Sequence, residues 1–193
     1  MIDLSANEAE TLAAKVARGA GFSWGLSDDI GRAARAIAPE GEDWSQALLA
    51  LARAGEAFEA PNLDRVARWR RGERDVAGAR LLCPVRTAAL LLDDPPDFRE
   101  GSLEITHVGL PIWLDALLRR SEMWIAPLSR PLVPCDDVTI RLGARPARSA
   151  VTRRPVIEEQ TLATLNAYAA RTYVPESERS RRRGAGGGKI DDD

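Results

Sequence analysis

The residues with the widest choice of chemistry gather in the last quarter of the chain, beyond Pro175. Hydroxyls, a guanidinium and glycine amides follow one another there, and the candidate ligand-binding residues are Ser177, Ser180, Arg181, Gly184 and Gly186. An arginine can bind a carboxylate or a phosphate through two parallel hydrogen bonds, and glycine allows the backbone to come close to a ligand. The pattern therefore predicts a site for a small anion.

Two further residues could transfer a proton at such a site: Glu178 in the same segment, and His107, the only histidine of the chain. Residues 102–108 alternate between apolar and polar side chains, which predicts a strand. The alternation places His107 on the face that carries Leu103 and Ile105. An inward imidazole can be a packed core residue whose nitrogens find backbone partners, or an acid, base or ligand that lines a pocket. The sequence leaves both interpretations open.

A second candidate site is the short aromatic turn at residues 22–26, which follows a glycine-containing helix end. Backbone amides at the start of the next helix can receive an anion, so Trp24 and Gly25 are candidate ligand-binding residues. The glycine spacing does not match a dinucleotide fingerprint, and it follows a helix instead of a strand. A tight corner between two helices, with no ligand, explains the same residues.

The cysteines and the single histidine exclude several classes of site. Cys83 and Cys135 are far apart and have neither metal nor redox spacing, so we expect two buried, reduced thiols and no metal site. The chain has no phosphate-binding loop and no set of nucleophile, base and orienting group. These absences argue against most standard hydrolases, zinc enzymes and nucleotide-driven enzymes as functions of this protein, and the sequence indicates no particular cofactor.

Charge and hydropathy limit the partners. The 193 residues carry a net charge of −2, which gives no overall field to attract nucleic acid or an anionic membrane. No segment approaches the roughly 20 apolar residues that span a bilayer, and residues 1–5 lack the basic start of a secretory signal. We expect a cytoplasmic protein whose partner is a small anionic metabolite or another protein. A homo-oligomer is compatible with these features.

Helical patterns fill residues 1–55 and predict a helical layer. Ser5 and Glu8 form a capping box, after which apolar residues repeat at helical spacing as far as Gly19. We expect a second helix to begin at the polar run 27–29, where the negative charge suits a helix start, and to end at Pro39. A third helix is expected after Asp43, ending at Gly55.

A weaker helical pattern covers residues 63–69 and carries many arginines around Trp69. The basic residues of this cluster are Arg65, Arg68, Arg70, Arg71 and Arg74. Such a cluster could hold a phosphate or stack a base. Five carboxylates in the same stretch balance the charge, so the composition favours a solvated face.

The remaining segments predict a mixed core. Residues 84–92 are apolar at both odd and even positions, so their periodicity does not distinguish a buried strand from a buried helix. A proline at the first helical turn favours a helix. Residues 110–120 describe a core helix with a basic last turn, and 123–126 and 138–142 look like strands separated by a loop that carries Asp136 and Asp137. The last helix is expected at 156–171.

These elements predict an α+β fold: an amino-terminal helical layer on a small, mostly antiparallel sheet, with a carboxy-terminal helix and a Gly/Arg-rich tail. We expect one globular domain over residues 1–174, with a helical layer at 1–55 and a mixed α/β core at 79–171. Residues 175–193 have no core-forming pattern and read as a flexible tail.

Two segments resemble a family. Residues 17–26, continuing to Gly31, Ala33, Ala34 and Arg35, resemble the amino-terminal signature of a bacterial family catalogued as domain of unknown function three-seven-two-six. Residues 171–175, followed by Ser177, Glu178, Ser180, Arg181, Gly184, Ala185 and Gly186, resemble its closing signature. The resemblance at both ends implies full-length membership. It implies no activity, substrate or cofactor.

Two function hypotheses follow. The first is a small metabolic enzyme, or a subunit of one, whose tail folds back over the body and binds an anionic molecule. The alternative is a non-catalytic interaction module whose tail docks on a partner protein. A contact between the arginine-rich tail and nucleic acid is a third reading, against which the acidic balance argues.

Overall fold

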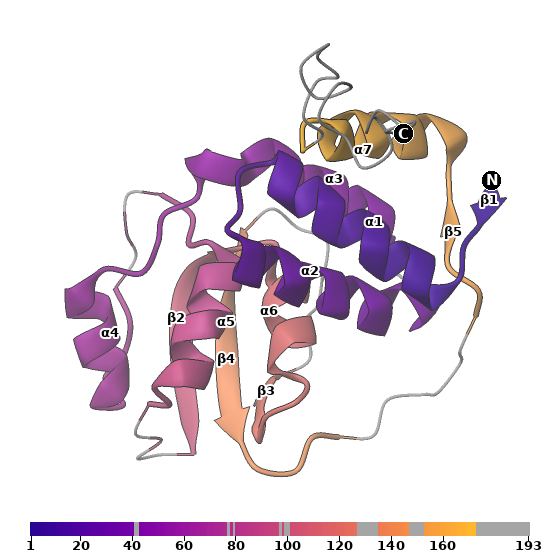
Figure 1. Cartoon of the computed structure of the whole chain (residues 1–193). Coiled ribbons are helices and arrows are strands. Elements are labelled where there is room, and N and C mark those ends of the chain that lie inside the picture. Colours follow the sequence, from indigo (N-terminus) through magenta and orange to yellow (C-terminus); the bar gives the residue numbers. More distant parts are fainter. Residues whose placement is uncertain are drawn as a thin grey trace, which may run out of the picture.

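The computed structural model describes residues 1–40, 43–76, 78, 80–96, 98, 101–126, 135–146 and 153–172. Within these residues the fold is α+β, as the sequence predicts. Figure 1 shows a helical layer at one side of the molecule and a small sheet at the other, with two helices between them. The predicted tail at 175–193 lies outside the described residues, and the predicted division into a domain and a tail stays a prediction.

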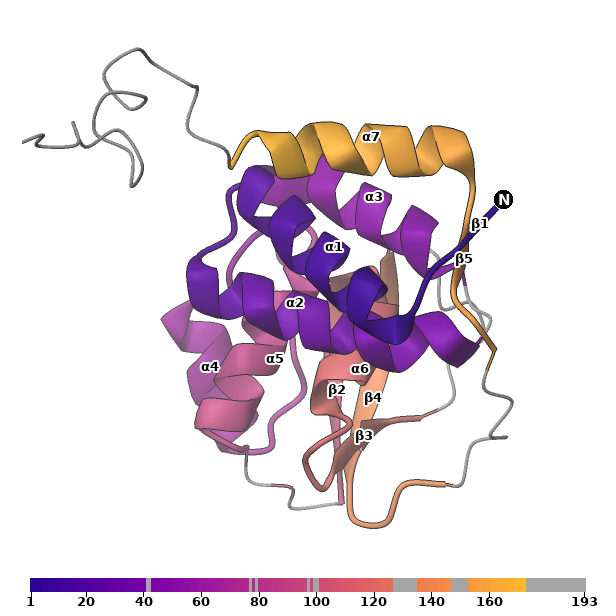
Figure 2. The same cartoon turned by 45° about the vertical axis from the view of Figure 1, so that its right-hand side comes forward.

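The helical layer contains α1 (Ala6–Gly19), α2 (Trp24–Ile37), α3 (Trp44–Ala54) and α7 (Glu159–Ala170), and α7 lies across α1 and α3 (Figure 2). The predicted capping box is present, since Glu8 N–H donates to the Ser5 hydroxyl and Ser5 N–H donates to the Glu8 carboxylate. Asp43 caps α3 in the same way as predicted, by accepting from Gln46 N–H. Short 3-10 turns at Ala38–Glu40 and Gly55–Ala57 follow α2 and α3.

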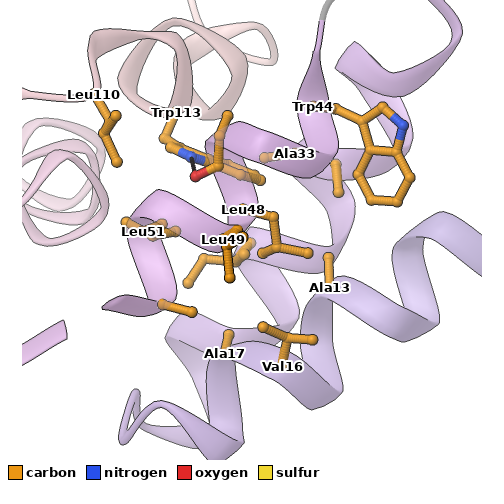
Figure 3. Packing of buried hydrophobic residues seen from close by; sticks show 14 of the residues in the cluster. Ala13, Val16, Ala17, Ala33, Trp44, Leu48, Leu49, Leu51, Leu110 and Trp113 are labelled. Atoms are coloured by element: carbon orange, nitrogen blue, oxygen red, sulfur yellow. Dashed lines mark hydrogen bonds between the residues drawn. The ribbon is translucent and has the colours of Figure 1, made fainter. Parts of the chain in front are cut away.

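Small and branched side chains fill the space between these helices. Figure 3 shows Ala13, Val16 and Ala17 of α1 facing the leucines of α3, with Trp113 on the other side of these leucines. The Trp113 indole N–H donates to the carbonyl of Ala47 at 3.2 Å, so its polar edge is satisfied although the residue is fully buried. Burial of this apolar surface is the main force that holds the layer together.

The sheet has three antiparallel strands in the order β2–β4–β3, namely β2 (Ser102–Gly109), β4 (Cys135–Leu142) and β3 (Met123–Ile125). Helices α5 (Pro84–Asp93) and α6 (Pro111–Leu118) lie between this sheet and α2, and α4 (Leu63–Arg70) adds Trp69 to the same core. Both α5 and α6 begin with proline at the first turn, which confirms the helix predicted at residues 84–92. Among the described residues, no helix has the length and apolar character to cross a membrane.

Two predicted element boundaries are wrong. Helix α2 begins at Trp24 instead of at residues 27–29, because Ser27 is fully buried and donates its hydroxyl to the Phe22 carbonyl from within the first turn. The last helix begins at Glu159, because Val156–Ile157 forms a short strand, β5, that pairs with β1 (Ile2–Asp3). The packing of Ile157 in the core keeps this segment extended.

Three predictions on the polar residues also change. Asp136 and Asp137 lie within β4 instead of in a loop before it. Arg68, Arg70, Arg71 and Arg74 are exposed, as expected of a solvated face, but Arg65 is buried and paired with Asp75. His107 is exposed instead of facing the core. The cause is a bulge, since Thr106 and His107 together face one residue of β4, so the alternation reverses and Val108 takes the buried place.

Candidate functional site

A cleft of about 380 Å³ opens between α2 and α6 and is lined by four arginines. Arg32 and Arg35 come from α2, and Arg119 and Arg120 follow directly after α6. Among the described residues of the lining, Asp29 is the only one with a carboxylate. The apolar residues of the lining are Ala33, Ala36, Leu92, Ala116 and Leu117. The cleft therefore combines cationic and apolar side chains.

The local sequence explains why these arginines converge. Asp29, Arg32 and Ala36 are spaced three and four residues apart, so they share one face of α2. Arg119 and Arg120 follow Leu118, where α6 ends and its carbonyls favour cations. Small side chains at the contact, among them Ala33 and Ala116, are buried where α2 approaches α6. Arginine side chains from both helices consequently reach the same opening.

Arg119 is held in one orientation by acceptors from three elements. Its guanidinium binds both oxygens of Glu40, at 2.6 and 2.9 Å, and donates to the Ala36 carbonyl at 3.3 Å. It also donates to Asp115 at 3.4 Å. Burial alone would lower the pKa of Arg119, but hydrogen bonds and charge attraction from Glu40 and Asp115 raise the pKa above its ordinary value. Arg119 is therefore a permanent cation that positions the wall of the cleft.

The other three arginines of the cleft form fewer or more exposed interactions than Arg119 does. Arg32 pairs with Asp29, and Arg35 pairs with Glu10 at 3.0 Å and contacts Asn7. The side chains of Arg32 and Arg35 are about half exposed, and exposed ion pairs contribute only about 0–1 kcal/mol. Arg120 is exposed and forms no hydrogen bond or ion pair with any described residue. These guanidiniums can exchange their partners for a ligand at small cost.

His107 lies at the bulge of β2, in an environment that the sequence did not predict. Its φ of 56° is in the left-handed region, and its backbone N–H donates to the Asp137 carboxylate at 2.9 Å. The Nδ1 atom lies 3.9 Å from the same carboxylate oxygen, and the imidazole is about half exposed. The residues that line the arginine cleft do not include His107.

Trp24 and Gly25 form the first turn of α2, at its corner with α1. Trp24 is 73% exposed, and the guanidinium of Arg18 lies 4.0 Å from the ring centre, in cation–π contact. Arg18 also pairs with Asp28 at 2.5 Å. A methyl group added at Gly25 would meet open space, so no packing within the described chain requires this glycine.

The structure brings together Trp24 and Gly25 but gives His107 a different set of contacts, with Asp137 and Leu82. The predicted residues Ser177, Glu178, Ser180, Arg181, Gly184 and Gly186 lie outside the described residues. The arginine cleft was not predicted from the sequence. Two features of the sequence point to this cleft: the helical spacing of Asp29, Arg32 and Arg35, and the two arginines after Leu118. The two arginines were interpreted only as the basic end of a helix.

In the described part of the chain, no three residues among histidine, cysteine, aspartate and glutamate come close enough together to hold a metal ion. Cys83 is a free, buried cysteine, and burial raises the pKa of its thiol. The buried thiol is therefore protonated and unreactive at neutral pH. The side chain of Cys135 lies outside the described part of the structure.

Residues 4–76 match the model of a family described as protein of unknown function (DUF3726), which confirms the amino-terminal part of the resemblance found in the sequence. Full-length membership stays a prediction. The match contains the amino-terminal signature and the whole of α2, with Arg32 and Arg35. The closing signature and the residues after α6 lie beyond it. No curated protein and no solved structure matches the chain.

Proposed function

We propose that the protein binds a small anionic molecule, a carboxylate or a phosphate, in the cleft between α2 and α6. The observation that carries the proposal is the convergence of four arginines on one opening, where Asp29 is the one carboxylate residue among the described lining. The planar guanidinium matches both kinds of anion through paired hydrogen bonds. The wall of the cleft thus offers several such donors at once.

The size of the cleft supports a small ligand. Its volume of about 380 Å³ falls at the lower end of the range of about 300–1,000 Å³ that is usual for small-molecule sites. Leu92 and Leu117 line the cleft beside the arginines, so an anion with a short apolar body suits it better than a fully polar one. Arg119 keeps the wall in place, while Arg32, Arg35 and Arg120 are the groups that reorient toward the ligand.

The residues of the cleft support a proposal of ligand binding but not one of catalysis. The candidate proton-transfer residue His107 is not in its lining, and Glu178 lies outside the described residues. An enzyme that uses these two residues stays a prediction. The alternative function, an interaction module whose tail docks on a partner, also depends on residues beyond Pro175 and stays a prediction, as does the cytoplasmic location.

Isothermal titration calorimetry with citrate and with inorganic phosphate tests the proposal. We expect saturable binding that weakens as sodium chloride is added. The double variant Arg32→Gln with Arg120→Gln should lose at least about tenfold in affinity, since each charged hydrogen bond contributes about 1.5–3 kcal/mol where water is excluded and less where it is not. Arg119 is left intact because its loss would disturb the packing.

The matched control is a variant with the same loss of charge elsewhere, Arg68→Gln in α4 with Arg71→Gln directly after this helix, both at exposed positions. This control should bind as the wild type does. If the cleft variant also retains wild-type affinity, or if neither anion binds, the proposed function is wrong.

A further inference from the structure

A second hollow, of about 650 Å³, runs between α1 and α7 on the outer side of the helical layer. One stripe of α1, together with Leu4 two residues before the helix, lines one side, and Leu4, Glu8, Thr11 and Lys15 are spaced three and four residues apart. Residues of α7 from Leu162 to its end line the other side. Most of the surface between these walls is apolar. We refer to this hollow as the α1–α7 groove.

The shape of the groove is maintained because α1 and α7 are held together at both of its ends. A methyl group at Gly19 would lie 1.8 Å from the Tyr168 carbonyl oxygen, so the backbones of α1 and α7 are in direct contact there. At the other end, β1 and β5 join the segments that lead into both helices. Leu4, Leu12 and Leu162 are left half-buried along the groove between these two points.

The two charged side chains of the groove have opposite signs and lie at different heights along α1. Glu8 and Lys15 are seven residues apart, which corresponds to about 10 Å along a helix. Thr11 and Leu12 lie midway between them. Hydrogen bonds from the backbone and side chain of Ser5 lower the pKa of Glu8, which is therefore ionised at neutral pH. The stripe carries a negative charge toward its start and a positive charge toward its end.

We propose that a second copy of this chain covers the α1–α7 groove, with the two α1 helices antiparallel about a two-fold axis near Thr11. This arrangement places Glu8 of each copy opposite Lys15 of the other and removes the half-buried leucines of both copies from water. A two-fold interface requires a surface that complements itself, and a stripe with one acid and one base at equal distances from its centre meets that requirement. A small apolar ligand would offer no opposite charge to Glu8 or to Lys15.

The proposed dimer is independent of the arginine cleft, so each can fail without the other. Sedimentation velocity over a range of protein concentrations should show a monomer–dimer equilibrium for the full chain. Lys15→Glu should weaken the dimer at least about tenfold, because two attractive pairs become repulsive, each by up to about 1 kcal/mol. The combined variant Glu8→Lys with Lys15→Glu exchanges the two charges and should restore dimerisation, although the loss of the capping box lowers its melting temperature.

Cross-linking tests the position of the axis. Thr11→Cys, made in a chain with Cys135→Ser, should form a disulfide-linked dimer under mild oxidation, because two copies of residue 11 meet near the axis. Asp64→Cys, at an exposed position of α4 in the same background, should not. A wild type that is monomeric at every concentration, a Lys15→Glu variant that dimerises like the wild type, or equal cross-linking at residues 11 and 64 would each overturn the proposal.

Discussion

Arg65 and Asp75 form a two-point ion pair inside the protein, with Nε to Oδ1 at 3.0 Å and Nη2 to Oδ2 at 2.5 Å. Their side chains are 5% and 0% exposed. Asp75 also accepts from the backbone N–H of Thr106 at 3.0 Å, and Arg65 donates to the Thr106 carbonyl at 3.1 Å. The pair thus joins α4 and the segment after it to β2, directly beside the bulge that turns His107 outward.

Removing the charge of Asp75 should be strongly destabilising. Asp75→Asn leaves the Arg65 cation buried without its counter-charge, which typically costs about 3–5 kcal/mol of unfolding free energy. Urea denaturation followed by circular dichroism measures the change. Glu73→Gln is the matched control, since Glu73 pairs with Arg71 at the surface and its loss should cost no more than about 1 kcal/mol. Equal losses in the two variants would contradict a buried, charged pair.

The same pair predicts a dependence of stability on pH. Burial would raise the pKa of Asp75, but hydrogen bonds from Arg65 and Thr106 and the charge of Arg65 outweigh it, and the folded-state pKa is lowered. A lowered pKa stabilises the folded state above the unfolded-state pKa of about 3.9, and this contribution is lost as the pH falls through the folded-state value. The stability difference between wild type and Asp75→Asn should therefore be constant near neutral pH and shrink below about pH 4. Urea titrations across this range test it, and a difference that grows on acidification would be contrary to it.

The sequence predicted the elements whose signals are local. Ser5 and Glu8 begin α1 and Pro84 begins α5 as expected, because caps and first-turn prolines act within a few residues. The start of α2 was misplaced because Ser23 and Ser27 are both suitable caps, and only the burial of Ser27 decides between them. Local chemistry therefore fixes the kind of element more firmly than its first residue.

Features that depend on distant contacts could not be predicted. No residue pattern predicted the bulge in β2. One extra residue in this strand is enough to place His107 on the solvent side of the sheet. The arginine cleft requires Arg32 and Arg120, which are far apart in the sequence, to meet where α2 packs on α6. Packing of this kind is decided by the whole core and not by the spacing of the residues that line the opening.

Gly19 and Gly25 should respond in opposite ways to alanine. Gly19→Ala places a methyl group against the Tyr168 carbonyl oxygen, and forcing α1 and α7 apart should cost about 1–3 kcal/mol. Gly25→Ala points into open space within the first turn of α2, where alanine should stabilise the helix by up to about 1 kcal/mol. Thermal denaturation compares the two variants. Similar melting temperatures would mean that α1 and α7 are not in backbone contact.

The backbone at His107 predicts which side chains that position accepts. A φ of 56° is tolerated by asparagine and strongly disfavoured by β-branched residues. His107→Val should therefore be less stable than His107→Asn by about 1–2 kcal/mol. Both variants remove the imidazole, so the comparison of their urea midpoints isolates the backbone effect from any role of the histidine. If valine proves as stable as asparagine, the bulge does not hold this conformation in solution.

Glu10 should limit how tightly the arginine cleft binds an anion. Its carboxylate pairs with the Arg35 guanidinium and competes with a ligand for the same donors. Because an exposed pair contributes up to about 1 kcal/mol, Glu10→Gln should raise the affinity for citrate by up to about fivefold in a calorimetric titration. Asp28→Asn makes the same change in net charge at the Arg18 pair, whose residues do not line the cleft, and should leave the affinity nearly unchanged. An equal rise in both variants would show that net charge alone attracts the anion, and a rise confined to Glu10→Gln would place Arg35 in the binding site.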